Sequence, residues 1–590
     1  MPAIGKTPAP ASGQARLRLE NGSRVAVIGG GPAGSFFSFF LLQMARRRGL
    51  QLQVDVFEPR DFERRGPGSC NMCGGVISES LVQNLAGEGI NLPSTLIQRR
   101  IDSYSLHMNV GSVRIPTPLQ EKRIASVHRG SGPRTFEPLN SNSFDAFLLG
   151  QAVGAGARRI PERVDRVAWN DGRPEVRTKN GLPQTYDLLA SAVGINTSSL
   201  QLVDLPDTAY APPESTKAYI SEFYLGQSMV KRYIGSSMHV FLLDLPRLAF
   251  AALIPKSDYV TVCLLGRDVG KELAQSFLNS SQVKECMPPL WRTPKSFCHC
   301  SPRISIRGAA RPFGDRVVFI GDCGVTKLYK DGVGAAYRTS KAAALTAAFR
   351  GVSAEDFRRH YWPTCRAIHA DNRIGKLIFA VTGRIQQSPY AQRAVWRMVS
   401  DEQSKSAGQR RMSLALWDVF TGSAPYRSVM LRALHPAFIG GFIRNLVAAR
   451  RPLDRPKRVK GIHMAKGSTG AMGKRFKEGE VICQQGERGD CMYVIQKGKV
   501  EVIQRQGDKE FCLAELSDGD FFGEMALFEQ QSRQATIRAL TDVWVYTLER
   551  DSLLRRLHED PSLAFKLIQQ MSYRIRELES ALIREVNTAS

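Results

Sequence analysis

The sequence predicts an α/β domain built on a parallel sheet, with an inserted antiparallel sheet and helices after it, followed by a small β-roll. Three observations support this prediction. A buried strand, a glycine-rich turn and a helix follow one another from residue 24, and a second strand ends in Gly-Asp before a helix of small residues at 316–345. Short strand-like runs separated by glycines fill residues 481–546. With 590 residues, the chain is too long for a single hydrophobic core.

The first element is a β-α-β unit over residues 24–60. Its first strand is 24–28, and its second strand, 53–57, ends in Glu58. After the first strand comes a glycine-rich turn, Gly29-Gly30-Gly31-Pro32-Ala33-Gly34. The first glycine of the turn permits a tight reversal, the third lets the main chain approach a pyrophosphate, and the last lets the helix pack on the strand. We therefore expect a Rossmann-type dinucleotide site at this turn, where Glu58 accepts hydrogen bonds from the adenosine ribose.

The second element, at 316–345, indicates which dinucleotide binds. Its strand ends in Gly321-Asp322, and the loop after it contains Gly332-Val333-Gly334. This segment resembles the second FAD-binding motif of the flavoprotein group that includes p-hydroxybenzoate hydroxylase, the electron-transfer dehydrogenases and geranylgeranyl reductase. The resemblance implies that FAD is the cofactor, that Asp322 hydrogen-bonds the ribityl chain, and that the glycine-containing loop lies against the isoalloxazine ring. A helix N-terminus there would stabilise the negative charge of reduced flavin.

Two further segments resemble geranylgeranyl reductases and related FAD-dependent oxidoreductases. Residues 68–76 are similar to their Cys-Gly-Gly segment, and residues 250–256 to a substrate-sheet strand that ends in Pro-Lys. The resemblance covers about residues 22–400. It implies a reductase of carbon–carbon double bonds in a hydrophobic, isoprenoid-like small molecule. The chain departs from the family pattern at 187–194, which stands where an Ala-Asp-Gly is common and lacks the acid of that triplet. It also departs at 140–145, which lacks the arginine that often precedes Phe-Asp and contacts FAD.

In such enzymes the flavin carries the reaction, and the protein orients the substrate and often supplies a proton. We single out Cys70 and Cys73 as candidate catalytic residues, either as a reactive thiol or as a redox disulfide; the alternative is packing in a tight loop. With Cys298 and Cys300 they would provide four thiolates for zinc or an iron–sulfur cluster, but nothing in the sequence brings the pairs together, and no metal site is predicted. We expect packing or surface roles for His107, His239 and His369. Lys330 and Asp331 are candidates for a proton relay near the flavin, with solvated loop charges as the alternative.

The β-roll carries a carboxylate and a guanidinium nine residues apart, Glu524 and Arg533. Glu524 can accept a hydrogen bond from a ribose 2′-hydroxyl, while Arg533 and nearby main-chain N–H groups hold a cyclic phosphate. Residues 476–586 resemble the cyclic nucleotide-binding domain of kinase regulatory subunits and bacterial catabolite regulators. Gln534 stands where cGMP-binding members have Thr or Ser, which favours cAMP over cGMP. The alternative is a domain that kept this fold and lost its ligand. The resemblance implies these ligand-binding residues: Gly523, Glu524, Met525, Ala526, Arg533, Gln534 and Ala535.

The net charge of +26 lies outside the β-roll. Residues 466–590 contain 18 Lys and Arg against 20 Asp and Glu, so the whole excess precedes residue 466. Such a field favours an anionic partner, and since no nucleic-acid-binding module is recognisable, we predict no nucleic-acid partner. An apolar stripe at 438–446 followed by a basic run at 450–460 is typical of peripheral contact with an anionic membrane, and equally of a docking helix before a solvated linker. Eleven cysteines without a framework pattern suit a reducing cytosol, so we predict a cytoplasmic protein.

These elements predict an order of domains. We expect a disordered leader at 1–21, an FAD-binding oxidoreductase domain at 22–350 with a substrate subdomain at about 100–135 and 200–305, helices at 351–450, a basic linker at 451–473 and a cyclic nucleotide-binding domain at 474–590. The predicted activity is reduction of an isoprenoid-like substrate, regulated or localised by cAMP, with NAD(P)H as a candidate electron donor. Two alternatives stay open: a flavin monooxygenase that uses NAD(P)H and O₂, and a cyclic nucleotide sensor whose flavin domain is a non-catalytic scaffold.

Overall fold

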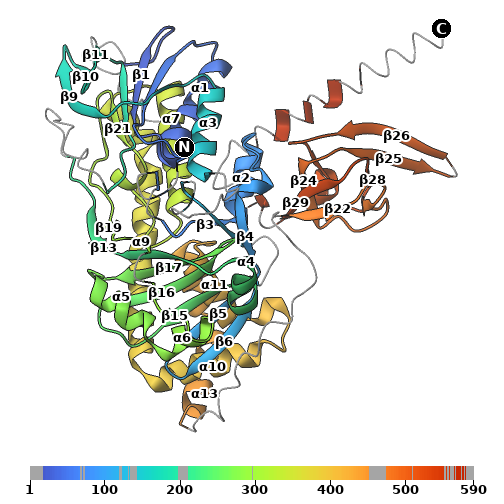
Figure 1. The fold of residues 1–590 in the computed structure, drawn as a ribbon. Helices are drawn as coiled ribbons and strands as arrows, with labels where there is room; N and C mark the ends of the chain where they lie inside the picture. The colour runs from blue at the N-terminus through green and yellow to red at the C-terminus, as the bar shows by residue number, and fades with distance from the viewer. Residues whose placement is uncertain are drawn as a thin grey trace, which may run out of the picture. The chain divides into compact units, whose positions relative to one another are not determined.

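The computed structural model (Figure 1) covers the main elements of both predicted regions. It describes residues 17–550, except for 65, 67–68, 71–72, 118–122, 131, 133–142, 197–209, 295–296, 451–472, 508 and 530, together with part of 553–579. Most of the predicted leader and linker therefore lies outside the described residues, as does the segment 140–142.

The chain divides into two compact units. One comprises residues 1–77, 95–118 and 124–467, and the other comprises residues 78–94, 119–123 and 468–590. The segment 78–94 thus packs with the C-terminal unit, although in sequence it lies between elements of the first unit. No sequence pattern indicated this exchange.

The first unit contains the predicted Rossmann-type sheet. Its six strands run in the order β20 (Phe313–Gly314), β21 (Val317–Phe319), β12 (Leu188–Ser191), β1 (Arg24–Ile28), β2 (Gln53–Phe57) and β8 (Arg158–Ile160). All neighbours are parallel except β20 and β21. Helix α1 (Pro32–Arg47) packs against α3 (Phe144–Gly154) and α7 (Gly332–Phe349), because small residues on α7 let the aromatic rings of α1 reach Tyr337. The predicted α/β fold class is confirmed.

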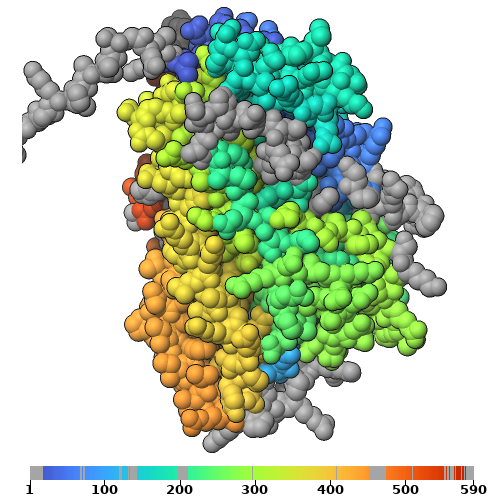
Figure 2. Space-filling model, turned by 90° about the vertical axis from the view of Figure 1, so that its left-hand side faces the viewer, coloured from blue at the N-terminus to red at the C-terminus, as the bar shows by residue number. Residues whose placement is uncertain are grey.

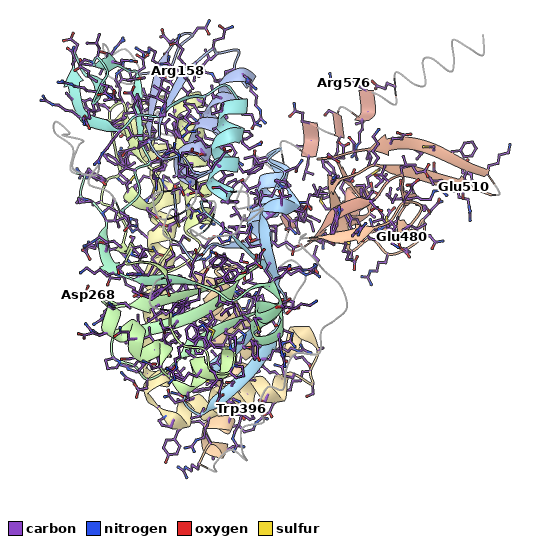
Figure 3. All side chains as sticks on the ribbon, viewed as in Figure 1. Arg158, Asp268, Trp396, Glu480, Glu510 and Arg576 are labelled. Carbon is purple, nitrogen blue, oxygen red and sulfur yellow. The ribbon has the colours of Figure 1, made fainter. Side chains whose placement is uncertain are left out.

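An ion pair links the neighbouring strands β2 and β8 of this sheet. Asp55 on β2 is buried, and it accepts hydrogen bonds from Arg158 Nε at 2.8 Å and from Tyr186 Oη at 2.9 Å. Figure 3 labels Arg158. Because an unpaired buried carboxylate would be costly, these donors let an acid occupy a central strand. Smaller sheets flank it: β11 (Gln184–Thr185), β10 (Arg173–Thr178) and β9 (Val164–Asn170); β3 (Val76–Ser78), β7 (Ile124–Val127) and β4 (Ile97–Ile101); and β13 (Glu214–Lys217) with β19 (Arg303–Arg307).

The second large sheet of this unit has seven strands. They run in the order β18 (Cys298–Cys300), β14 (Tyr219–Tyr224), β17 (Tyr259–Gly266), β16 (Leu248–Pro255), β15 (Ser237–Leu242), β5 (Ser103–Met108) and β6 (Gly111–Pro116). Only β15 and β5 are parallel neighbours. Both faces are apolar, so both are covered: one by α5 (Lys271–Leu278) and α6 (Ser281–Cys286), the other by helices that follow residue 350.

Helices that follow residue 350 line one side of the first unit. Figure 2 shows them in yellow to orange beside the green strands of the seven-stranded sheet. They are α8 (Ala354–His360), α9 (Trp362–Gln387), α10 (Pro389–Glu402), α11 (Arg411–Thr421), α12 (Tyr426–Ala433) and α13 (Pro436–Ala448). Short turns at α4 (Gln227–Met229) and at 230–234 complete the unit. Within the described part of the chain, none of the helices is both long and apolar enough to cross a membrane.

The C-terminal unit is a roll of two four-stranded antiparallel sheets. One has the order β22 (Lys474–Phe476), β29 (Val543–Glu549), β24 (Cys491–Lys497) and β27 (Phe521–Phe522); the other has the order β23 (Val481–Cys483), β28 (Thr536–Ala539), β25 (Val500–Gln506) and β26 (Lys509–Leu516). Helix α14 (Glu524–Glu529) follows β27 directly. Helix α2 (Glu79–Gly87) packs on β24 in this unit. The predicted β-roll is confirmed.

Candidate cofactor and ligand sites

The glycine turn after β1 leaves no room for side chains. Gly29 has φ +104°, and a Cβ on it would lie 2.5 Å from the Ala192 carbonyl oxygen. A Cβ on Gly34 would overlap the carbonyl oxygen of Gly29. The strand, the turn and α1 are therefore packed main chain against main chain, which is the arrangement a diphosphate-binding turn requires.

Glu58 stands at the predicted place beside this turn, but it is already engaged. The residue is 1% exposed, and its carboxylate accepts hydrogen bonds from Gly30 N at 3.0 Å and Arg60 Nε at 3.0 Å. A ribose hydroxyl at Glu58 would have to share the carboxylate with these donors. Glu58 is occupied in this way because Arg60, two residues further along the chain, folds back and pairs with its carboxylate.

The second predicted motif meets the first. Gly321 has φ +66°, and a Cβ on it would lie 2.6 Å from the Cβ of Ala33 in the glycine turn. A Cβ on Gly332, at the start of α7, would lie 3.9 Å from Asp322 Oδ1. Glu58, Asp322 and the N-terminus of α7 thus surround one turn, as a single FAD would require. Asp322 is exposed, yet the protein around its carboxyl shields that group from water and raises its pKa, while Thr326 and the nearby Arg129 act in the opposite direction.

Arg129 supplies a cation that the sequence pattern did not reveal. Its Nε lies 2.6 Å from Asp145 Oδ1 and its Nη2 lies 3.1 Å from Asp145 Oδ2, which makes a bidentate ion pair. The side chain of Asp145 is fully buried. Arg129 also interacts electrostatically with Asp322. We expected no arginine before Phe144-Asp145, and along the chain there is none; folding brings one from just after β7 instead. A cation beside Asp322 suits a cofactor with a negatively charged diphosphate.

The loop that contains Cys70 and Cys73 packs closely against the seven-stranded sheet. A Cβ on Gly74 would lie 2.9 Å from Cys263 Sγ, and one on Gly130 would lie 2.6 Å from the Ser69 carbonyl oxygen. Cys70 and Cys73 are half-buried, and neither is part of a disulfide. Strand β18 is the edge strand of the same sheet, and it places Cys300 where it interacts electrostatically with both Cys70 and Cys73. Burial, followed by the effect of Cys70, raises the pKa of the Cys300 thiol to about 12.

The two cysteine pairs therefore share one neighbourhood, which nothing in the sequence indicated. Their sulfur atoms do not converge on a point: among the described residues, no group of three cysteine, histidine or acidic ligands within 4.8 Å of one another includes them. The zinc or iron–sulfur alternative has no such group to support it.

A buried ion pair lies next to these thiols. Lys256 Nζ is 2.6 Å from Glu222 Oε1, and Thr261 Oγ1 donates to the same oxygen at 2.9 Å. Burial opposes the charge of Lys256, but Glu222 outweighs it, so the pKa of Lys256 is raised. Burial and then Lys256 lower the pKa of nearby His128 to about 3, so this imidazole is neutral. The strand ending in Pro-Lys thus places a permanent cation, paired and 2% exposed, at the sheet end.

Lys330 is not the solvated charge that we considered. Its Nζ is shielded from solvent, has no hydrogen-bond partner among the described residues, and lies 5.0–5.9 Å from the centres of three aromatic rings, those of Phe379, Phe420 and Tyr426. Burial, followed by the charge of Lys327, places the pKa of Lys330 well below 10.5. Asp331 has φ +55° and pairs with Arg338 at 3.0 Å. An ammonium that is easily deprotonated therefore stands immediately before α7.

In the C-terminal unit, Arg533 is held with one donor free. The residue is 5% exposed, its Nη2 donates to the Cys491 carbonyl oxygen at 2.7 Å, and its guanidinium lies over the Tyr493 ring. Its Nη1 is buried without a hydrogen-bond partner in the described structure, directly beside Gly523, whose φ of +81° leaves no space for a Cβ. A buried cationic donor without an acceptor is unusual and fits an anionic ligand such as a cyclic phosphate.

Glu524 is buried at the start of α14, nearby in the same cassette. Its Oε1 accepts a hydrogen bond from Arg574 Nη1 at 3.0 Å, and Arg574 also donates to the Phe521 carbonyl oxygen. Burial raises the pKa of Glu524, while Arg574 and Arg533 lower it. Met525 is exposed, Ala526 lies against Gly489, and Gln534 and Ala535 follow Arg533 into β28. Arg574, contributed from outside the predicted cassette, was missed because its separation from Glu524 has no local pattern.

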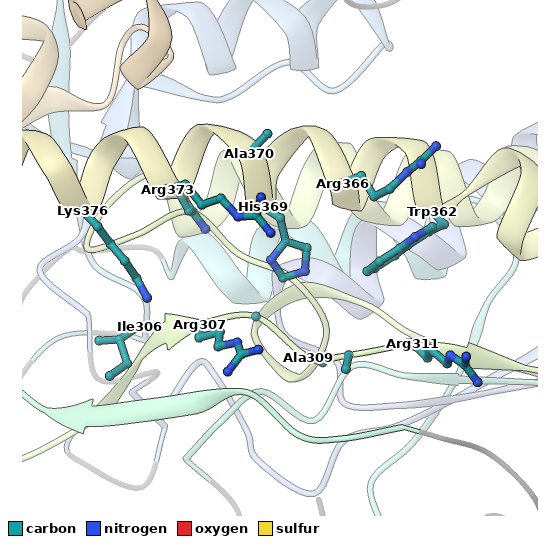
Figure 4. Close-up of a pocket in the computed structure, with 13 residues that line it drawn as sticks. Ile306, Arg307, Ala309, Arg311, Trp362, Arg366, His369, Ala370, Arg373 and Lys376 are labelled. Atoms are coloured by element: carbon teal, nitrogen blue, oxygen red, sulfur yellow. The ribbon is translucent and has the colours of Figure 1, made fainter.

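Several cations of the first unit line a cavity of about 590 Å³ (Figure 4). It lies between α9 and the segment 306–311, and Trp362 and Ile306 form apolar walls. No ion pair in the described part of the chain involves four of its cations: Arg311, Arg366, Arg373 and Lys376. Uncompensated cations around an apolar hollow favour an anionic group there.

Comparison with known proteins identifies the C-terminal unit. A family model described as "Cyclic nucleotide-binding domain" matches residues 473–560. This part of the chain is a cyclic nucleotide-binding domain. Over 108 residues it is 32% identical to the cyclic AMP receptor protein of Thermus thermophilus and 29% identical to the CRP-like cAMP-activated global transcriptional regulator of Mycobacterium tuberculosis. These matches cover 18% of this chain, and the chain spans about half the length of the curated relatives it matches, 50% and 48% respectively.

Solved structures similar to the first unit are distant. A flavoprotein/dehydrogenase from Cytophaga hutchinsonii has 14% identity and a TM-score of 0.49, covering 73% of this chain and 100% of its own. The halogenase PltM, solved with phloroglucinol and FAD, has 13% identity and a TM-score of 0.47, covering 72% and 91%. The peptidyl tryptophan dihydroxylase QhpG has 18% identity and a TM-score of 0.43, covering 63% and 75%.

Proposed function

We propose that this protein is an FAD-dependent oxidoreductase whose cyclic nucleotide-binding domain takes cAMP as a regulatory ligand. The observation that carries the proposal is the approach of the two motifs: the Gly321 position abuts Ala33 of the glycine turn, so Asp322 and Glu58 flank the same main-chain cradle. Residues 29–34 would hold the diphosphate, Asp322 the ribityl chain, and the N-terminus of α7 the flavin ring. Bound FAD would supply hydride transfer.

The protein's own groups can position substrate and move protons. Lys330 is the candidate proton donor, because burial lowers its pKa and its Nζ has no competing acceptor among the described residues. Cys70 and Cys73 stay candidates as thiols at the edge of the sheet. The buried Lys256–Glu222 pair is better suited to fixing the sheet end, since each charge is already satisfied.

The substrate proposed is a hydrophobic, isoprenoid-like molecule with a reducible double bond. The support is the resemblance of residues 68–76 and 250–256, together with apolar residues on the seven-stranded sheet. NADPH oxidation that tracks O₂ uptake and gives a hydroxylated product would reject the reductase in favour of the monooxygenase.

The test of the cofactor is an absorbance spectrum of the purified full chain before and after reconstitution with FAD. We expect a flavin spectrum at one FAD per chain. A colourless protein that takes up no FAD would favour the alternative of a cyclic nucleotide sensor on a non-catalytic scaffold.

We infer that regulation by cAMP acts through one continuous segment of the polypeptide. The segment 78–94 belongs to the C-terminal unit, where Gln83 Nε2 donates to the Thr547 carbonyl oxygen at 3.3 Å and Gln496 Nε2 donates to the Leu92 carbonyl oxygen at 2.9 Å. At both ends this segment continues into strands of the first unit. If cAMP favours one arrangement of the roll, the change is transmitted along this segment. Gln83→Ala combined with Gln496→Ala should leave cAMP affinity intact and abolish the effect of cAMP on turnover.

Peripheral contact with an anionic membrane is proposed at α13. Phe438 and Phe442 pack inward, while the outer face of the helix exposes a second apolar row: Ile439, Ile443, Leu446 and Val447. An exposed apolar row on a strongly basic unit suits the surface of anionic lipid. Ile443→Glu should reduce sedimentation with phosphatidylserine vesicles and leave neutral vesicles unaffected; equal sedimentation of both proteins would contradict the proposal.

A further inference from the structure

Three buried metal-ligand side chains converge on one face of the seven-stranded sheet. His107 Nε2 lies 2.9 Å from His239 Nδ1, and Cys286 Sγ lies 3.6 Å and 3.4 Å from these two nitrogens. The residues come from β5, β15 and the last position of α6, and all three are buried. The sequence predicted only packing or surface roles for the two histidines, because the three residues are separated by 47 to 179 positions.

The outer nitrogens of both rings already have partners. His239 Nε2 lies 3.2 Å from the Ile234 carbonyl oxygen, which can only accept, so this nitrogen carries the proton and Nδ1 presents a lone pair toward the cluster. His107 Nδ1 lies 2.7 Å from Ser112 Oγ, which can accept a hydrogen bond from the ring when Nδ1 is protonated. Such outer hydrogen bonds are what orient metal-binding imidazoles in proteins. The stacked ring of Phe241, 4.6 Å from His107, further restricts rotation.

The spacing of the three atoms is close to that around a metal ion. With bonds of about 2.05 Å to nitrogen and about 2.3 Å to sulfur, ligands in tetrahedral geometry lie about 3.3 Å (N···N) and about 3.6 Å (N···S) apart. The two sulfur distances fit already, and the nitrogen pair would have to open by about 0.4 Å.

We propose that His107, His239 and Cys286 form a binding site for a d10 metal ion, zinc(II) or copper(I). Thiolate and imidazole are the donors that both ions prefer. On binding, the Cys286 thiol loses its proton to solvent and the sulfur–metal bond forms, while His107 moves its proton from Nε2 to Nδ1 and its lone pair binds the ion. No electron is transferred, and one proton leaves per ion.

The position of the site gives the ion a structural task. It joins the parallel pair β5 and β15 to α6, which otherwise lies on the sheet through a few apolar side chains. No fourth histidine, cysteine or acid of the described residues joins the group. Copper(I) accepts three ligands and gives a neutral complex with one thiolate, whereas zinc(II) needs a fourth ligand, such as water.

The test uses the full-length chain stripped of metal by a chelator and titrated with cobalt(II), whose bonds to thiolate absorb strongly in the near ultraviolet. We expect saturation at one ion per chain with a thiolate charge-transfer band, and release of one proton per ion in weakly buffered solution. Cys286→Ser should lose the band and His239→Gln should weaken binding, whereas Cys365→Ser, a buried cysteine on α9, should behave as wild type.

Separate arms distinguish the two ions. Zinc(II) that displaces cobalt stoichiometrically identifies a zinc site; copper(I) added anaerobically and retained against a colorimetric chelator, with X-ray absorption showing two nitrogens and one sulfur, identifies a copper site. The X-ray spectrum is taken on wild-type protein, so a variant that fails to fold does not affect it. The proposal is overturned if the wild type binds none of the three ions stoichiometrically, or if the bound ion shows no sulfur ligand.

Discussion

Replacing Arg533 by alanine is the most direct test of the ligand site in the C-terminal unit. The guanidinium is buried, one of its donors is satisfied by the Cys491 carbonyl oxygen, and its Nη1 has no acceptor among the described residues. A cyclic phosphate at this place could accept hydrogen bonds from both N–H groups of Nη1, each charge-assisted and worth about 1.5 kcal/mol or more. Their loss totals about 3 kcal/mol, so the dissociation constant for cAMP should rise roughly 100-fold.

The assay is isothermal titration of full-length protein with cAMP and then cGMP. Arg533→Lys keeps the charge but not the planar fork, so its loss of affinity should be smaller than that of Arg533→Ala. Arg505→Ala removes an exposed arginine that pairs with Glu510 in the same unit, and it should bind as wild type. Flavin content should be equal in all four proteins. If Arg533→Ala binds cAMP within threefold of wild type, the phosphate is held elsewhere and the reasoning fails.

Three other predictions follow from the geometry. Arg574→Ala frees the carboxylate of Glu524 for a ribose hydroxyl, so cAMP affinity should rise about threefold, as expected for a half-buried pair; a lower affinity would show that Arg574 assists the ligand instead. Asp322→Ala should lower the FAD content of the purified protein without changing cAMP binding, and unaltered flavin absorbance would contradict its role at the ribityl chain. The Glu222–Lys256 pair should stabilise the fold between pH 4.5 and 10.5, because the folded-state pKa of Glu222 lies below 4.5 and that of Lys256 above 10.5. The difference in Tm between wild type and Glu222→Gln should therefore shrink as the pH falls below 4.5, and a difference that is constant from pH 3 to 7 would refute it.

The parts of the site that could be predicted from sequence are those made by consecutive residues. The turn 29–34 could be recognised because each glycine answers a local main-chain demand, and the structure leaves Gly29 and Gly34 no room for a Cβ. The cassette at 523–535 was recognised from the spacing of Glu524 and Arg533 and from its resemblance to a known family, and the family match at 473–560 confirms the domain. In contrast, the solvated role considered for Lys330 was wrong, since burial depends on helices that follow it by many residues.

The amino-acid order by itself determined the glycine-containing turns at 29–34 and 321–334, the β-roll and the uneven charge, because these depend on backbone freedom, side-chain periodicity and composition over short stretches. Only the tertiary structure decided which distant side chains meet: Arg129 with Asp145, Lys256 with Glu222, and His107 with His239 across adjacent strands. Such contacts depend on strand order and register, and no local pattern encodes them. They are nevertheless where buried charges and lone pairs must find partners, since burial makes an unsatisfied polar group costly.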